Sequence, residues 1–388
     1  MPEPATAVAV PRARTRRDPA HELGCEVAGA LRVVVRDGRS EDLGAVTRDA
    51  GPPSALAAET PIRMPRLEIS FVDHLATSAL RLLDGGSVGY AGSGLYTLAA
   101  SGSPESCIEQ GTAWGSGSIV CTRGLRKIPF LSAAIDLAAL RGELAPLHAS
   151  AWVTPEGVGV IASGWAHSGK TGALLAACEH GARPIGDDRV LLSTDGSRML
   201  GCGGLVEAKD WHVAQLPRLR STLGSSRGIL AKAGYALASR RAGGGRSGWG
   251  RLFDRALTKA RSYTNVEIDL SSGEGAEARS SARPQVLLLM EMHDDDRIVA
   301  EPADPDSVAT RLAAHARAEM LAVLRAQLAY EYAHPGGGWR NVEEAPRMTA
   351  EILERAVRGI SAWIVRHPYP CSLERLHEVT SEIAGSVR

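Results

Sequence analysis

The sequence predicts an α/β fold, with a β-rich region before its core and helices after it. Three observations lead to this prediction. An apolar run at 158–162 leads through a glycine-rich loop into a helix-like segment at 171–180. An Asp-Asp pair stands just before a second apolar run, 189–193. The stretch 284–291 is the most apolar of the chain and is predicted to be a buried central strand. Strands that alternate with helices in this way are typical of a sheet covered by helices.

The glycine-rich loop has the sequence Gly-Trp-Ala-His-Ser-Gly-Lys-Thr, which is the phosphate-loop pattern. Its glycines let successive backbone N–H groups point at phosphate oxygens, and the N-terminus of the next helix adds positive potential. In this pattern Lys170 reaches the β- and γ-phosphates, and the Thr171 hydroxyl binds magnesium. A chance match among 42 glycines is the alternative, and the flanking strand and helix argue against it. We therefore expect ATP and Mg²⁺ as cofactors, bound by the loop residues Gly164, Trp165, Ala166, His167, Ser168, Gly169, Lys170 and Thr171.

A pair of carboxylates, Asp187 and Asp188, follows the helix of the loop and precedes a predicted strand. Carboxylates placed beside bound phosphates can hold magnesium or accept a proton from an attacking hydroxyl. A solvated Gly-Asp-Asp turn is the alternative, and it would be favoured if the pair stood alone. Next to a phosphate loop, we expect the pair to belong to the site.

Together these segments resemble the catalytic domain of HPr kinase/phosphorylase and its phosphoenolpyruvate-carboxykinase-like relatives. The resemblance rests on Leu-His-Ala-Ser-Ala at 147–151, the strand and loop at 159–171, Gly181, and Asp-Asp-Arg-Val at 187–190. The short distance in sequence from the loop lysine to the Asp pair is more specific than the loop alone. The resemblance is close over 148–193 and looser beyond it. It implies a kinase that transfers the γ-phosphoryl group to a hydroxyl, and related kinases often assemble as homo-oligomers.

The resemblance assigns roles to individual residues. Lys170 and Thr171 keep their phosphate and magnesium roles. Asp187 matches the catalytic base toward the acceptor hydroxyl, and Asp188 matches the companion acid near the metal. His148 matches the histidine that faces the transferred phosphate, whereas the sequence alone favours a half-buried strand residue. The implied catalytic set is therefore Asp187, His148 and Lys170, and the implied metal ligands are Thr171 and Asp188.

The chain also departs from true HPr kinases. The glycine-rich signature that follows their Asp pair is not visible in 201–216, so Glu207 and Lys209 stay open as site residues. His167 has no counterpart, and exposure at the loop tip is its simplest explanation. A recognisable HPr kinase N-terminal domain is missing too. We expect a divergent relative, of the kind that includes small-molecule serine kinases and kinases that modify ribosomally made peptides.

Two other functional classes stay open. A nucleotide-binding regulatory protein would bind ATP without phosphorylating any acceptor, and an intact Asp187 argues against it. A different phosphoryl-transfer enzyme would use the same fold on a non-hydroxyl acceptor or on water.

The composition and charge of the chain argue against nucleic acid and membranes as partners. The 388 residues include 44 basic and 44 acidic side chains, so no net field draws the chain to nucleic acid or to a membrane. Six scattered cysteines without paired metal spacing favour free thiols in a reducing cytosol. No apolar run reaches the roughly 18 residues of a membrane helix, and the N-terminus lacks the pattern of a secretory signal. We expect a cytoplasmic protein whose partner is a peptide or small-molecule acceptor.

The sequence predicts four regions. Residues 1–60 are predicted to be disordered or poorly structured apart from a short strand at 31–36, and 61–145 to form a small antiparallel β subdomain. Residues 146–300 make the core, and 301–388 a helical region. Within the last region, the pattern predicts one long helix from Pro305 to about residue 334, and further helices at 348–365 and from Ser372.

Two polar segments leave alternatives open. Between Lys209 and Arg261 twelve Lys or Arg residues face two Asp residues, within an Arg/Gly-rich insertion at about 209–262. It could be a lid over phosphates, a surface for an acidic substrate, or a solvated insertion. Arg218 and Arg220 lie nearest the core and are candidates for phosphate or substrate contacts. His-Asp-Asp-Asp at 293–296 is better explained as a polar turn than as a metal cluster.

Overall fold

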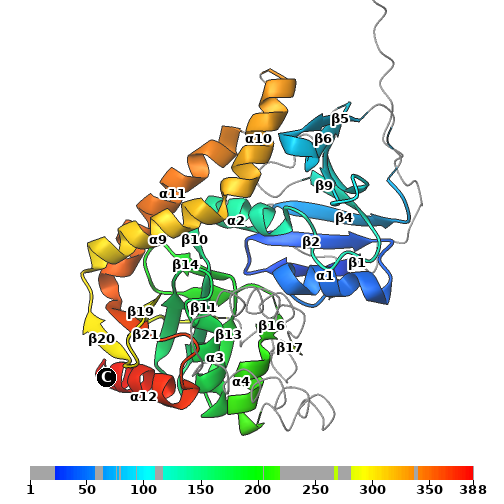
Figure 1. The fold of residues 1–388 in the computed structure, drawn as a ribbon. Helices are drawn as coiled ribbons and strands as arrows, with labels where there is room; N and C mark the ends of the chain where they lie inside the picture. The colour runs from blue at the N-terminus through cyan, green and yellow to red at the C-terminus, as the bar shows by residue number, and fades with distance from the viewer. Residues whose placement is uncertain are drawn as a thin grey trace, which may run out of the picture. The chain divides into compact units, whose positions relative to one another are not determined.

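The computed structural model describes most of the chain, which forms two compact units (Figure 1). The described residues are 22–56, 64–75, 77, 80–92, 94–109, 117–203, 205–218, 266–269, 281–335 and 340–387. The first unit comprises the chain up to Ala145 together with 316–349, and the second comprises 146–315 and 350–388. The expectations for residues 1–21, for Arg220 and for most of the Arg/Gly-rich insertion lie outside the described residues.

The first unit is built on a mixed nine-stranded sheet in the order β3-β1-β2-β4-β9-β8-β7-β6-β5. Its strands are β1 Glu22–Val27, β2 Leu31–Arg36, β3 Ser54–Leu56, β4 Arg66–Val72, β5 Arg81–Leu83, β6 Val88–Ala91, β7 Gly94–Leu98, β8 Pro104–Glu109 and β9 Gly117–Thr122. The pairs β2–β4 and β4–β9 are parallel. The prediction of a purely antiparallel subdomain is therefore wrong at the centre of the sheet. Helices α1 (Ser40–Ala50) and α2 (Leu131–Arg141) pack against each other and against β1 and β2.

The N-terminal prediction needs a correction. Residues 22–56, expected to be poorly structured apart from one strand, form β1, β2, α1 and β3. Leu31, Val33 and Val34 are fully buried, so β2 is a core strand of the first unit. The sequence missed this because strands of three to six residues are too short to show a clear period. Gly-Pro-Pro at 51–53 forms the short connection between α1 and β3.

The second unit carries a six-stranded sheet in the order β13-β11-β12-β19-β21-β20, together with smaller sheets β10-β14-β15-β18 and β16-β17. The strands of the large sheet are β11 Ala149–Val153, β12 Gly159–Ser163, β13 Arg183–Gly186, β19 Val286–Met292, β20 Val299–Pro302 and β21 Ser361–His367. The smaller sheets contain β10 Leu144–Leu147, β14 Val190–Ser193, β15 Met199–Gly201, β16 Leu205–Ala208, β17 Val266–Asp269 and β18 Ser281–Ala282. The central pairs β12–β19 and β19–β21 are parallel. The prediction of a buried central strand at 284–291 is confirmed.

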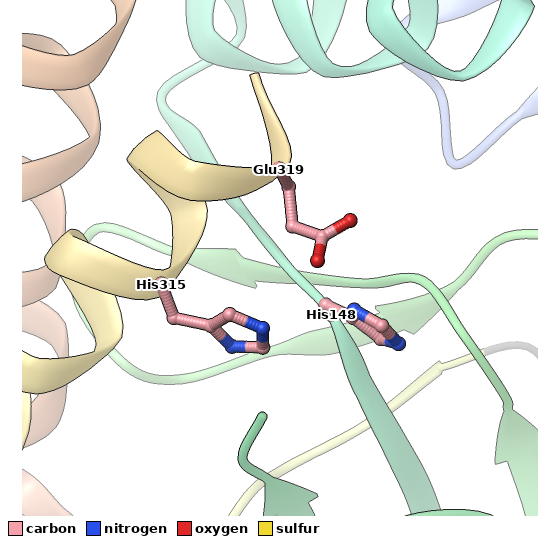
Figure 2. Close-up of side chains that lie close together, drawn as sticks. All are labelled: His148, His315 and Glu319. Atoms are coloured by element: carbon pink, nitrogen blue, oxygen red, sulfur yellow. The ribbon is translucent and has the colours of Figure 1, made fainter. Parts of the chain in front are cut away.

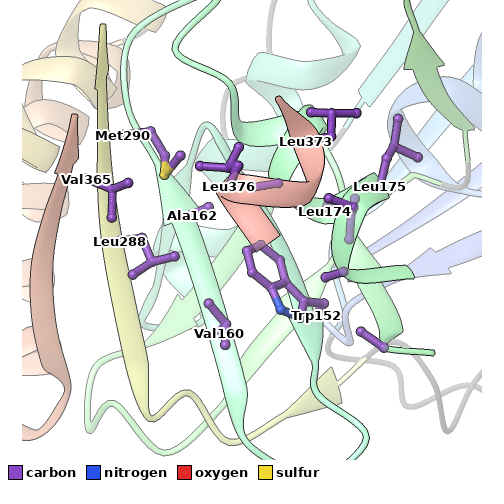
Figure 3. Close-up of a cluster of buried hydrophobic side chains, with 14 of the residues drawn as sticks. Trp152, Val160, Ala162, Leu174, Leu175, Leu288, Met290, Val365, Leu373 and Leu376 are labelled. Atoms are coloured by element: carbon purple, nitrogen blue, oxygen red, sulfur yellow. The ribbon is translucent and has the colours of Figure 1, made fainter. Parts of the chain in front are cut away.

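A hydrophobic core joins the large sheet to two helices, α3 (Lys170–Glu179) and α12 (Leu373–Gly385) (Figure 3). Apolar side chains of β12, β19 and β21 face leucines of both helices across the core. The labelled members of this core are Trp152, Val160, Ala162, Leu174, Leu175, Leu288, Met290, Val365, Leu373 and Leu376. Because β12 is buried along its whole length, the loop that follows it starts from a fixed position.

The C-terminal region is more divided than the sequence predicts. The single helix expected from Pro305 is two helices, α9 Pro305–Glu319 and α10 Leu321–Ala333. The helix expected at 348–365 ends earlier, as α11 Arg340–Ala356 and a short 3-10 turn, and 361–367 form β21 instead. Parallel pairing with β19 decides this, because an Ala-Trp-Ile-Val run suits a strand between two neighbours.

The other C-terminal predictions hold. The polar turn predicted at 293–296 is confirmed, and there the Asp295 carboxylate accepts from the side chain and backbone N–H of Arg297. The final helix begins after Ser372, whose hydroxyl accepts from the backbone N–H of Arg375 at 3.3 Å. Within the described ranges, no helix is both long enough and apolar enough to traverse a lipid bilayer.

Candidate functional site

The phosphate-loop sequence forms the connection between β12 and α3 in the second unit. A Cβ at Gly164 would lie 2.3 Å from the carbonyl oxygen of Met290, so the loop leaves the sheet where only glycine fits. Gly169 has a φ of 89°, and a Cβ there would lie 2.5 Å from Nε2 of His367. Both glycines of the pattern are therefore required by space, and one of them also by backbone conformation.

His367 supports the loop from the end of β21. Its side chain is fully buried, and its Nε2 donates to the carbonyl oxygen of Ser168 at 2.8 Å. Sequence reasoning assigned no role to His367, which follows the helix predicted at 348–365, and so missed this contact. A polar residue at the end of an apolar strand was the available signal.

Lys170 places a buried positive charge at the loop. Its side-chain ammonium donates to the carbonyl oxygens of Gly164, at 2.7 Å, and Trp165, at 2.9 Å. The neighbouring Ser168 hydroxyl is buried and has no hydrogen-bond partner among the described residues. The side chain of Ser168 thus takes no part in the hydrogen bonding of the loop, whereas its backbone N–H donates to the carbonyl oxygen of Trp165 at 3.1 Å.

The acid pair forms a strained turn between β13 and β14. The backbone N–H of Arg189 donates to the carbonyl oxygen of Asp187 at 2.7 Å, and Asp188 between them has a φ of 61°. A γ-turn with positive φ at its centre is the rarer and more strained form. The two carboxylates end in different environments, because Asp187 is buried while the Asp188 side chain is 76% exposed.

Asp187 joins the acid pair to the loop helix. The Thr171 hydroxyl lies 3.1 and 3.3 Å from its two carboxylate oxygens, and the Ser150 hydroxyl donates to Oδ1. Burial raises the pKa of Asp187 to about 6, the charge of Asp188 adds to the rise, and the two hydroxyl hydrogen bonds oppose it. Sequence reasoning missed Ser150, which lies in β11 two residues after His148.

His148 lies between β10 and β11, beside the exposed acid. Its Nε2 is 3.6 Å from Oδ1 of Asp188, and this contact is the main cause that lowers the pKa of Asp188, with the charges of Lys170 and Arg189 adding to it. The His148 ring stacks on His315 of α9, with centroids 5.3 Å apart (Figure 2). His315 also stacks with Trp165 of the loop, at 5.0 Å. His148 is thus held next to the acid pair.

Most of the loop, the acid pair and His148 line one pocket of about 230 Å³. The predicted catalytic residues line it, as do the loop residues from Ala166 to Thr171; Gly164 and Trp165 do not. Glu207 and Lys209, which the sequence left open, line it too, and so do the unforeseen His212 and Tyr369. Arg218 does not, and its backbone N–H instead donates to Glu179. The volume is below the roughly 300 Å³ where small-molecule pockets begin, so it can enclose only part of a nucleotide.

The residues present fit magnesium and phosphate. A threonine hydroxyl and two carboxylates supply the hard oxygen ligands that magnesium prefers. Two glycines without room for a Cβ and the first turn of α3 supply the backbone N–H groups that phosphate requires. No family model matches the chain, and a search of curated proteins also found no match.

Proposed function

We propose that this protein is an ATP- and magnesium-dependent kinase that transfers the γ-phosphoryl group to a Ser or Thr hydroxyl of a peptide or a small molecule. One observation carries the proposal above all. The hydroxyl after the phosphate-loop lysine, on Thr171, is hydrogen-bonded to the buried acid Asp187. In phosphate-loop enzymes the hydroxyl after the loop lysine and a nearby carboxylate hold magnesium together, and this contact puts the two groups within reach of one ion.

The loop lysine, the loop threonine and the acid pair each have a defined task in this proposal. Bound magnesium ATP supplies a phosphoryl group whose negative charge is partly neutralised. The Lys170 ammonium binds phosphate oxygens in place of the carbonyl oxygens of Gly164 and Trp165. Thr171 and Asp188 offer oxygen ligands to the ion. Charge neutralisation and positioning supply most of the rate, because phosphoryl transfer asks little covalent chemistry of the protein.

Asp187 takes the proton of the acceptor hydroxyl on its carboxylate. A pKa of about 6 leaves the carboxylate mostly ionised at neutral pH and more basic than an ordinary aspartate. A general base works best when its pKa lies near the working pH. Ser150 and Thr171 fix the orientation of the carboxylate, and His148 stands beside Asp188 at the same end of the pocket.

The test is phosphoryl transfer from labelled ATP with magnesium to serine, threonine and short peptides that carry them. We expect a phosphorylated acceptor with the wild type and with two control variants, Asp294→Asn and Lys127→Ala, which change exposed residues outside the pocket. Lys170→Ala should lose ATP binding. Asp187→Asn should keep ATP binding and lose transfer.

Other outcomes would replace the proposal with one of its rivals. ATP binding that depends on Lys170, with no acceptor or water ever phosphorylated, would identify a regulatory nucleotide-binding protein. Release of phosphate to water, or phosphorylation of a carboxylate or amine, would identify a different phosphoryl-transfer enzyme.

A further inference from the structure

A second lysine, Lys209, lines the pocket and is held there by neutral groups. It stands between β16 and helix α4 (Asp210–Gln215). Its ammonium lies 3.0 Å from Nδ1 of His167 and 2.8 Å from the hydroxyl of Tyr369. These contacts use two of its three N–H donors. Among the described residues no carboxylate forms an ion pair with it, so its charge is available to an anion in the pocket.

The backbone of His167 supports a functional role for this contact. His167 has a φ of 66°, a conformation that costs free energy for any residue with a Cβ. Glycine would avoid that cost at the loop tip. The His167 side chain accepts the hydrogen bond that holds Lys209, and the charge of Lys209 lowers the pKa of His167, which keeps the ring neutral.

Lys209 and the acid pair lie on different sides of the first turn of α3. Thr171 contacts Asp187, whereas a Cβ at the next residue, Gly172, would lie 3.4 Å from Nε2 of His212 in α4. Successive residues of a helix project about 100° apart. The backbone N–H of Lys209 donates to Nδ1 of His212 at 3.1 Å. The Lys209 cluster (Lys209, His167 and Tyr369) therefore lies toward the Gly172 side of the helix and the acid pair toward the Thr171 side, at two ends of the pocket.

The chemistry of the residues indicates which part of the nucleotide each end of the pocket would bind. In a phosphate loop the magnesium ligand and the lysine mark the β- and γ-phosphates, so the acid pair marks the end where transfer occurs. The α-phosphate and the nucleoside must then lie toward the other end. There the Lys209 ammonium is suited to a phosphate, and the ring of Tyr369, which is 37% exposed and backed edge-on by Trp211, is suited to a flat base or ribose.

We propose that Lys209 binds the α-phosphate of the nucleotide and that Tyr369 contacts the nucleoside. The nucleotide then runs from the acid pair to the Lys209 cluster, and the acceptor approaches beside Asp188 and His148. This assignment rests on the proposed function, because it presumes that a nucleotide occupies the pocket.

The test measures dissociation constants of magnesium ATP, magnesium ADP and inorganic tripolyphosphate by calorimetry. The proteins are the wild type, Lys170→Ala, Lys209→Met, Tyr369→Leu, His167→Gly and the control Lys127→Met. We expect Lys209→Met to weaken ATP and ADP at least tenfold, and Tyr369→Leu to weaken both on the order of tenfold while tripolyphosphate changes less than twofold. His167→Gly should weaken both nucleotides without lowering the midpoint of thermal unfolding.

The possible results distinguish failure of this nucleotide orientation from failure of the proposed kinase function. If the wild type binds no ATP, both fail. If ATP binds, and Lys170→Ala abolishes binding while Lys209→Met and Tyr369→Leu leave it unchanged, only this inference fails. It also fails alone if Tyr369→Leu weakens tripolyphosphate as much as ATP, or raises the KM of the acceptor alone.

Discussion

Replacing Asp187 with asparagine should stabilise the protein while it removes the proposed base. The side chain is only 9% exposed, and burial raises its pKa from 3.8 to about 6, with the charge of Asp188 adding to the rise. A carboxyl whose pKa is higher in the folded state binds its proton more tightly there. Ionising Asp187 as the pH rises therefore lowers the free energy of unfolding.

The size of the effect follows from the shift. The pKa rises by about 2 units, and each unit corresponds to about 1.4 kcal/mol, so an ionised Asp187 costs at most about 3 kcal/mol above pH 7. Part of this cost is shared with Asp188, so Asp187→Asn should raise the free energy of unfolding by about 1 to 3 kcal/mol. Asparagine has the same shape, and the hydroxyls of Ser150 and Thr171 can rotate to hydrogen-bond with its amide.

The pH dependence identifies the cause. Below about pH 4 the carboxyl is protonated in both the folded and the unfolded state, so the two proteins should differ little. The advantage of the variant should grow as the pH rises through about 6 and level off above it. Urea unfolding at pH 4 to 8 in the presence of a chelator measures this, with the exposed Asp294→Asn as control. A variant less stable than the wild type at pH 8, or an advantage that does not change with pH, would show that the buried charge of Asp187 does not destabilise the fold.

Three further predictions concern other parts of the molecule. Asp42 is fully buried in the first unit and accepts from Arg123 at 3.0 Å, so Asp42→Asn should lower the free energy of unfolding by about 2 to 4 kcal/mol; an unchanged urea midpoint would contradict this. Ser168→Ala removes a buried hydroxyl that lacks a partner in the described part of the chain, so it should add about 1 kcal/mol of stability and leave ATP affinity unchanged, and a destabilised variant would count against this. Burial and the ring of His180, stacked at 3.8 Å, lower the pKa of His377 below 6.5, so stability should fall as the pH drops below that value. His377→Phe keeps the stack and should flatten thermal unfolding midpoints between pH 5.5 and 7.5, and an equal drop in both proteins would argue against this cause.

The centre of the site could be predicted from sequence because its signals are local. The strand, loop, helix and acid pair lie within 159–188, and each element shapes the next. The sequence placed the acid pair beside the loop, and in the structure Thr171 and Asp187 are hydrogen-bonded. The tight backbone of the loop could also be predicted, because the phosphate-loop pattern contains the two glycines, Gly164 and Gly169, that have no room for a Cβ.

The rest of the site depends on distant segments. His367 contacts a loop residue 199 positions away, and Tyr369 reaches Lys209 across 160 positions. His367 ends β21 and Tyr369 follows it. Because the sequence pattern suggested a helix over 348–365, the strand that carries both residues to the loop was not foreseen. The strands at 22–56 were missed for a related reason. Pairing with neighbouring strands stabilises these short strands, and the local hydrophobic pattern of the sequence does not reveal it.

A single-turnover measurement can decide whether Asp187 is the base of a kinase. Wild type and Asp187→Asn are saturated with labelled magnesium ATP, mixed with an excess of an accepted serine or threonine acceptor, and quenched over time. The proposed mechanism predicts that Asp187→Asn binds ATP as the wild type does and transfers the phosphoryl group on the order of 100-fold more slowly or worse, as expected for a lost general base. Transfer by Asp187→Asn at the wild-type rate would contradict it.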